Sequence, residues 1–205
     1  MGLYRKYMLP WLLHLAMKNR EASRYRSRII PAARGRVLEV GIGSGLNLPY
    51  YPREIESVTG VDPSAELLAM ARRAAKDLPF PMTFQQGGAE RLALDDRSFD
   101  TVVTTWTLCT IPEGAMALSE MRRVLRPGGE LIFIEHGLSP DRRVAAWQRR
   151  LNPLWNRCTG GCNLDRSIDR LIREAGFAVK RLETGYLIQG PRPMTFHFEG
   201  RAERA

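Results

Sequence analysis

The stretch Val37-Leu38-Glu39-Val40-Gly41-Ile42-Gly43-Ser44-Gly45 decides the fold. A short apolar, largely β-branched run ends in three alternating glycines, which predicts a strand, a tight turn and the start of a helix. In that layout, backbone N–H groups at the turn come close to a nucleotide-like ligand. A second apolar run, residues 57–62, ends in Asp62. A carboxylate placed about 20 residues after the turn can accept hydrogen bonds from ribose hydroxyls.

The glycine spacing distinguishes between nucleotide ligands. A dinucleotide fingerprint reads G-x-G-x-x-G, whereas here the third glycine is Gly45 and the dinucleotide position is Leu46. Glu39 lies two residues before the first glycine. A carboxylate there would repel a pyrophosphate but tolerates a zwitterionic ligand with net positive charge. The motif therefore favours such a ligand over a dinucleotide.

Strands and helices alternate along the rest of the chain. Strands are predicted at residues 36–40, 58–62, 82–86, 99–105, 130–135, 177–184 and 194–199. Helices are predicted at residues 64–76, 113–125, 141–157 and 166–175. This order predicts an α/β fold with a doubly wound, Rossmann-like sheet of mostly parallel strands, a closing antiparallel hairpin and helices on both faces. Ligands of such sheets bind beyond the carboxyl ends of the strands.

The chain divides into a basic amphipathic helical arm, residues 1–34, and an α/β domain, residues 35–205. The arm is expected to form one or two helices, with a break at Pro10 and a stop at Pro31. Residues 1–36 carry nine Lys and Arg against one acid, Glu21. Three roles fit such an arm: a lid over the ligand, packing on the sheet, or peripheral contact with an anionic membrane.

Composition bounds the class of protein. With 205 residues, 44% of them hydrophobic, the chain suits one globular domain. Three cysteines, Cys109, Cys158 and Cys162, indicate a reducing, cytoplasmic setting. The basic arm leaves a peripheral membrane location as the alternative. Their spacing does not fit a metal site. The net charge is +9, but no nucleic-acid-binding module is visible. We expect no metal and no nucleic-acid partner, and no segment indicates an oligomer.

Five segments resemble the successive motifs of class I S-adenosylmethionine-dependent methyltransferases, in order and at the usual spacing. They are residues 37–45, 61–64, 88–92, 98–102 and 124–131. The resemblance implies a seven-stranded sheet that binds S-adenosylmethionine over the glycine turn. By the same resemblance, Glu39, Gly41, Gly43 and Gly45 border the methionine and ribose, Asp62 takes the ribose hydroxyls, Pro63 flanks the adenine, Ala89 and Glu90 lie at the adenine edge, and Thr105 and Trp106 face the methyl-transfer side.

Four further segments look like the mammalian alkyl thiol S-methyltransferases: residues 106–111, 133–136, 151–155 and 161–166. This resemblance implies methyl transfer to a small, largely apolar acceptor, with a thiol as the expected class. Those proteins carry an N-terminal hydrophobic membrane anchor, whereas the N-terminus here is shorter and basic. Two alternatives stay open: a quinone precursor or amino phospholipid as acceptor, and a non-catalytic adaptor that binds S-adenosylmethionine.

His136, Trp106 and Asp165 are the candidate catalytic residues. His136 follows a predicted strand at its carboxyl end, where an imidazole can accept a proton from the acceptor or orient it. Packing or capping would explain His136 equally well. Asp165 is a natural N-cap for the predicted helix 166–175, and the family resemblance alone places it in the acceptor pocket. Trp106 could line an apolar acceptor chamber with Trp147.

Overall fold

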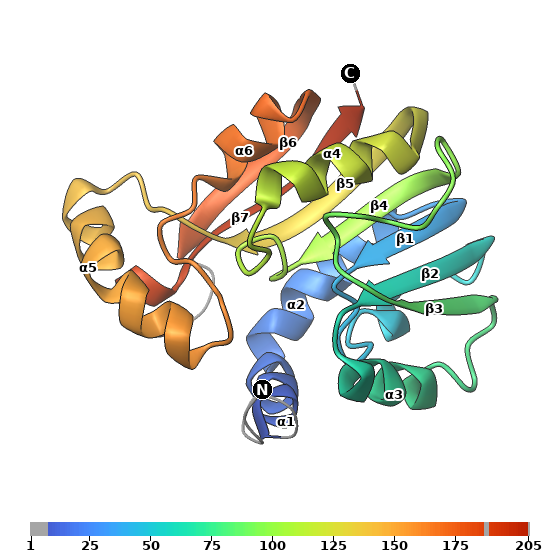
Figure 1. Cartoon of the computed structure of the whole chain (residues 1–205), viewed down its shortest axis with the longest axis horizontal. Helices are drawn as coiled ribbons and strands as arrows, with labels where there is room; N and C mark the ends of the chain where they lie inside the picture. The colour runs from blue at the N-terminus through green and yellow to red at the C-terminus, as the bar shows by residue number, and fades with distance from the viewer. Residues whose placement is uncertain (1–7, 187–188, 205) are drawn as a thin grey trace.

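The computed structural model describes residues 8–186 and 189–204 (Figure 1). Seven strands form one sheet in the order β3-β2-β1-β4-β5-β7-β6. The strands are β1 (Arg36–Val40), β2 (Ser57–Asp62), β3 (Met82–Gln86), β4 (Phe99–Thr105), β5 (Leu125–His136), β6 (Phe177–Tyr186) and β7 (Phe196–Arg204). The α-helices are α1 (Leu9–Met17), α2 (Arg20–Ile29), α3 (Ala65–Ala74), α4 (Gly114–Val124), α5 (Arg142–Cys158) and α6 (Ile168–Glu174).

The predicted sheet is confirmed. Strands β1 to β5 pair in parallel, while β7 runs antiparallel between β5 and β6. The carboxyl ends of the parallel strands therefore meet at one edge of the sheet. The glycine turn follows β1 at that edge, Asp62 ends β2, Thr105 ends β4 and His136 ends β5.

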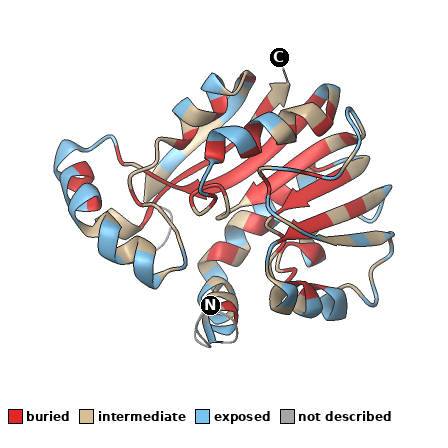
Figure 2. Cartoon of the chain, viewed as in Figure 1, coloured by how far each residue is buried: buried red, intermediate tan, exposed pale blue. Residues whose placement is uncertain are grey.

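Two layers of helices cover the sheet. Helices α4 and α6 pack on one face through buried Leu118, Met121 and Ile172. Helices α2 and α3 cover the other face through Ile29 and Leu68. The buried residues run along the strands between these layers (Figure 2). Among the residues that the structure describes, no helix is long and apolar enough to cross a membrane.

The helix expected directly after the glycine turn was wrong. The chain makes only a short 3-10 turn, Leu48–Tyr50, before it enters β2. Pro49 has no N–H for a helical bond, and Pro52 disfavours helical geometry at the preceding residue.

The arm differs from its predicted outline as well. Pro10 does not break α1 but lies in its first turn, where a missing N–H costs nothing. The break comes at Lys18 and Asn19, and the side chain of Asn19 caps α2 by accepting a hydrogen bond from the Ala22 N–H. Residues 3–7 of the predicted arm lie outside the described residues.

Two strand boundaries also differ. Strand β5 begins at Leu125 rather than residue 130, because Leu125 pairs with Phe99 across an irregular register. Strand β7 continues to Arg204, beyond the predicted residue 199, since Glu203 pairs with Glu130 of β5. Both extensions depend on a neighbouring strand rather than on local apolar periodicity.

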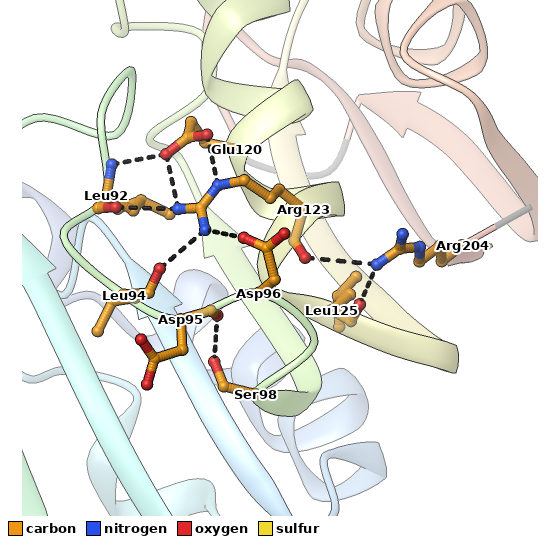
Figure 3. A network of polar contacts seen from close by, with 9 residues as sticks. All are labelled: Leu92, Leu94, Asp95, Asp96, Ser98, Glu120, Arg123, Leu125 and Arg204. Carbon is orange, nitrogen blue, oxygen red and sulfur yellow. Dashed lines mark hydrogen bonds and ion pairs between the residues drawn. The ribbon is translucent and has the colours of Figure 1, made fainter.

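Arg123 of α4 holds the connection between β3 and β4 (Figure 3). Its guanidinium donates to the carbonyls of Leu92 and Leu94 and forms ion pairs with Asp96 and Glu120. Glu120 in turn accepts a hydrogen bond from the Leu92 N–H. The network therefore attaches to α4 the segment that follows Ala89 and Glu90, the candidate adenine contacts.

Candidate functional site

The glycine turn is shaped by positive backbone angles and by close approach. Gly41, Gly43 and Gly45 have φ values of 72°, 54° and 80°, which side-chain-bearing residues rarely adopt. A Cβ on Gly41 would lie 2.2 Å from the side chain of Thr107, so this position admits only glycine. A Cβ on Gly43 would meet nothing closer than 3.9 Å. Open space therefore lies over Gly43, where the family resemblance places the ligand.

Asp62 lies beside this turn. It accepts hydrogen bonds from the backbone N–H groups of Gly43 at 2.9 Å and Ser64 at 2.8 Å, one on each carboxylate oxygen. A carboxylate has about four acceptor sites, so both oxygens retain capacity for a pair of hydroxyls. Burial raises the pKa of Asp62, and the two backbone hydrogen bonds oppose that rise. The geometry fits a ribose that approaches along the sheet edge.

Glu39 lies under the turn, and only 1% of it is exposed. Its oxygens accept hydrogen bonds from Asn47 Nδ2 and the Tyr51 hydroxyl, both at 2.8 Å. Asn47 also donates to Thr105 Oγ1 at 3.0 Å, which connects the turn to β4. Burial raises the pKa of Glu39 to about 7, despite these hydrogen bonds and the charge of Arg26. Positive charge on a ligand at this site would stabilise the ionised carboxylate.

The arm contributes Arg26, which the sequence did not single out. Arg26 is 3% exposed, donates from Nε to Asn47 Oδ1 at 3.1 Å, and lies 4.9 Å from the ring centre of Trp106. No local feature of the sequence distinguishes Arg26 from the other basic residues of the arm. On α1, His14 Nδ1 lies 2.7 Å from Ser44 Oγ in the glycine turn. Both helices of the arm therefore touch the candidate ligand site.

Glu135 organises the loop that follows β4, and the sequence did not assign it this role. Its buried carboxylate accepts hydrogen bonds from the Thr104 hydroxyl and from the backbone N–H groups of Thr107 and Cys109. Arg166 holds the same loop from the other side by donating to the carbonyls of Leu108 and Ile111. The loop thus carries Trp106 and Cys109 in a fixed position.

Trp106 begins this loop in a left-handed backbone conformation, with φ of 50°. Such an angle is uncommon outside glycine and marks a position that the surrounding structure constrains. Its indole Nε1 is buried and has no hydrogen-bond partner in the part of the chain that the structure describes. The ring packs edge-on against His197, with ring centres 6.1 Å apart.

Two thiols and one imidazole form a row next to His197, the ring that Trp106 contacts. Cys109 and His136 are buried, and Cys162 is half-buried. The sulfurs of Cys109 and Cys162 are 3.6 Å apart, and Cys162 Sγ lies 3.6 Å from His136 Nδ1. Asn163 holds the two loops together by donating to the Cys109 carbonyl through its backbone and side-chain nitrogens. The other ring nitrogen, His136 Nε2, is buried and unpartnered among the described residues.

The protonation of this row follows from its surroundings. The adjacent Cys162 and complete burial raise the pKa of Cys109 well above its usual range, so Cys109 keeps its proton. Hydrogen bonds with Cys109 and then with His136 lower the pKa of Cys162 to about 5, although burial opposes this. Within the pair, the proton therefore favours Cys109 and negative charge favours Cys162, which lies next to an imidazole whose second nitrogen has no partner among the described residues. His197 packs behind this imidazole, and burial lowers its pKa to about 4.

The remaining predicted site residues lie either beside Asp62 and the glycine turn or away from them. Ala89 and Glu90 form a turn after β3, and the Gly87 N–H at its start donates to the Asp62 carbonyl. Pro63 is exposed beside Asp62. Asp165 was wrongly expected to cap a helix: α6 begins at Ile168, and no hydrogen bond or ion pair joins the Asp165 side chain to another described residue.

Several known methyltransferases are similar to this chain in sequence. A methyltransferase domain model matches residues 38–133. The chain is 38% identical over 147 residues to a phosphatidylethanolamine N-methyltransferase of Cereibacter sphaeroides, covering 71% of each protein. It is 36% identical over 151 residues to thiol S-methyltransferase TMT1B of Rattus norvegicus, covering 72% of this chain and 62% of that protein. It is 33% identical over 181 residues to thiol S-methyltransferase TMT1A of Homo sapiens, covering 82% of this chain and 71% of that protein.

Solved structures share the fold. A SAM-dependent methyltransferase of Thermotoga maritima superposes with a TM-score of 0.69 at 21% identity, covering 99% of this chain and all of that one. An arsenic(III) S-adenosylmethionine methyltransferase of Chlamydomonas reinhardtii gives 0.61 at 29% identity, covering 85% of this chain and 64% of that one.

The residues of the site fit S-adenosylmethionine. Asp62 is free to accept two hydroxyls, the space over Gly43 admits a ligand, and the raised pKa of Glu39 favours a cationic group nearby. The chain belongs to the class I S-adenosylmethionine-dependent methyltransferases and lies close to the TMT1 thiol S-methyltransferases.

Proposed function

We propose that this methyltransferase acts on a small, largely apolar thiol. The observation that carries the proposal is the row Cys109, Cys162 and His136 at the carboxyl end of β5. The row ends in a buried nitrogen, His136 Nε2, that has no hydrogen-bond partner in the described part of the chain. A thiol reacts as its thiolate, so its site needs a group that takes the proton. We assign this role to His136 Nε2. The relatives TMT1A and TMT1B, which are named thiol S-methyltransferases, support a thiol acceptor.

In this mechanism, Cys162 fixes the tautomer of His136. The Cys162 sulfur accepts the Nδ1–H, which leaves the lone pair on Nε2 facing the acceptor. The S–H bond of the acceptor breaks, the proton moves to Nε2, and the electron pair stays on the acceptor sulfur. Cys162 then stabilises the imidazolium. Bound S-adenosylmethionine supplies a methyl group that is already electrophilic, so no covalent nucleophile of the protein is required.

The same proposal assigns the cofactor contacts. Asp62 accepts the ribose hydroxyls, the glycine turn takes the methionine and ribose, and Glu39 supplies negative charge beneath a cationic ligand. Trp106 lines the methyl-transfer side. Since His14 contacts Ser44 and Arg26 contacts Asn47, we assign the arm the role of a lid that excludes water.

The test is methyl transfer from labelled S-adenosylmethionine to alkyl and aryl thiols. His136→Ala should lower turnover by about 100-fold, the usual range for losing a general base, while the Kd for S-adenosylmethionine stays the same. Cys162→Ser should lower turnover by less than His136→Ala does, because it changes only the group that orients the imidazole. Cys158→Ser is the matched control, since Cys158 is exposed and should behave as wild type. Full turnover by His136→Ala across the pH range would remove His136 from the mechanism.

An amino phospholipid is the second candidate acceptor. The 38% identity to a phosphatidylethanolamine N-methyltransferase favours it. Phosphatidylethanolamine therefore belongs in the acceptor panel, together with demethylated quinone precursors. Transfer to the lipid but not to thiols would overturn the thiol proposal and keep the cofactor site. Cofactor binding without transfer to any acceptor would favour the adaptor alternative.

A further inference from the structure

Helix α5 presents an unusual face to solvent. Trp147 and Leu154 are 55% and 66% exposed, and they lie seven residues apart, so their side chains project from the same face. Arg143, Arg150 and Arg157 repeat with the same spacing and are also exposed. They form a second row beside the first. Trp147 therefore does not line the acceptor chamber for which the sequence made it a candidate.

The charged side chains of α5 are all positive. Its 17 residues include five arginines, Arg142, Arg143, Arg149, Arg150 and Arg157, and no acid. A solvent-exposed helix usually carries both positive and negative side chains along its surface. No ion pair engages these arginines within the described part of the chain. Arg150 instead lies 5.8 Å from the ring centre of Trp147.

Helix α1 exposes a second apolar stripe. Met8, Trp11, Leu12 and Leu15 are all exposed and fall on one side of the helix. Helices α1 and α5 both lie toward the carboxyl ends of the parallel strands (Figure 1). The apolar and basic surfaces therefore flank the edge of the sheet where the site lies.

We propose that α5, together with α1, docks this protein on an anionic lipid bilayer. Trp147 and Leu154 enter the interfacial region, and the arginine rows contact the headgroup phosphates. Two other occupants fit less well. A second copy would bring like-charged arginine rows together, and nucleic acid would leave the two large apolar side chains without a function. Docking would bring the edge of the sheet that carries the candidate site close to the bilayer, in which an apolar acceptor concentrates.

The experiment is sedimentation of the full chain with vesicles. One set contains equal parts of phosphatidylcholine and phosphatidylglycerol, and the other contains phosphatidylcholine alone. Wild type should bind the anionic vesicles at low salt and dissociate at high salt, because the Debye length shrinks. The double variant Arg143→Gln/Arg150→Gln should bind about 10- to 30-fold more weakly, at about fivefold per arginine near such a surface. Trp147→Ser/Leu154→Ser should lose on the order of tenfold through lost apolar burial.

Matched controls separate docking from general effects. Arg170→Gln/Arg173→Gln removes the same charge from exposed sites on α6 and should bind as wild type. Met116→Ser removes an exposed apolar side chain from α4 and should also leave binding unchanged. Circular dichroism and S-adenosylmethionine affinity report whether each variant is folded.

Several results would overturn the proposal. They are failure of wild type to bind anionic vesicles, equal binding to neutral vesicles, and equal losses in the α6 control. Loss of binding in Trp11→Ser/Leu15→Ser with no effect of the α5 variants would assign docking to α1 alone. If the α5 variants do not fold, the salt and lipid dependence of wild type still decides whether the surface is electrostatic.

Discussion

Replacing Glu39 with glutamine should stabilise the protein at high pH while it weakens the cofactor site. The carboxyl has a pKa of about 7 in the fold against 4.5 in an ordinary environment. At 1.36 kcal/mol per pKa unit, the ionised group costs the folded state about 3 kcal/mol above pH 7. The fold binds this proton more tightly than the unfolded chain does. The free energy of unfolding therefore falls as the pH rises from below 4.5 through about 7.

Urea unfolding without cofactor, at a series of pH values between about 4 and 8, tests this reasoning. Glu39→Gln should match wild type at the acidic end and exceed it by about 2 to 3 kcal/mol at the alkaline end. Glu120→Gln is a control for which a change in stability of the opposite sign is expected. A hydrogen bond from Arg123 lowers the pKa of Glu120, so its loss should destabilise the protein at neutral pH. Parallel curves for wild type and Glu39→Gln would refute a raised pKa at Glu39.

The same titration should appear in cofactor binding. A cationic ligand stabilises the ionised carboxylate, so affinity for S-adenosylmethionine should increase as the pH rises toward and through about 7. Calorimetry on wild type and Glu39→Gln separates this effect from titration of the ligand, because the ligand is common to both. An unchanged pH dependence in the variant would show that Glu39 does not sense the ligand charge.

Three further substitutions test the rest of the site. Asp62→Ala should abolish measurable S-adenosylmethionine binding by calorimetry, and tight binding would contradict the ribose assignment. Gly43→Ala should cost about 1 kcal/mol in urea unfolding, because φ is 54°, and should weaken the cofactor more strongly, since its Cβ enters the open space. Glu135→Ala should cost about 3 to 5 kcal/mol, because it leaves a cavity and the buried N–H groups of Thr107 and Cys109 unpaired. A loss below about 1 kcal/mol would mean that water replaces the carboxylate.

Local sequence was sufficient for the sheet and for the glycine turn. The alternation of strands and helices gave the topology, and the turn required glycine for backbone reasons that are visible in a few consecutive residues. Two local details were misread. The helix after the turn failed at Pro49, and the cap at Asp165 failed because α6 starts three residues later, at Ile168.

The polar contacts of the site were less accessible to sequence reasoning. Arg26 read as one of nine basic residues near the N-terminus, and nothing local indicated that it is buried against Asn47. Cys109 and Cys162 are 53 residues apart, so their contact exists only after two loops meet. His136 could be nominated from its place at a strand end, but its contact with Cys162 could not.

The two carboxylates of the proposed cofactor site, Glu39 and Asp62, connect stability with binding. Burial raises the pKa of both Glu39 and Asp62, so the free protein holds negative charge at a cost. Arg26 offsets part of that cost at Glu39, which makes the arm part of the site's electrostatics. A ligand with positive charge offsets more. S-adenosylmethionine should therefore stabilise the fold beyond its direct contacts, and a neutral analogue of the same shape should stabilise it less. Thermal unfolding with each ligand measures this difference, and equal stabilisation by the two would show that the ligand's charge does not act on these carboxylates.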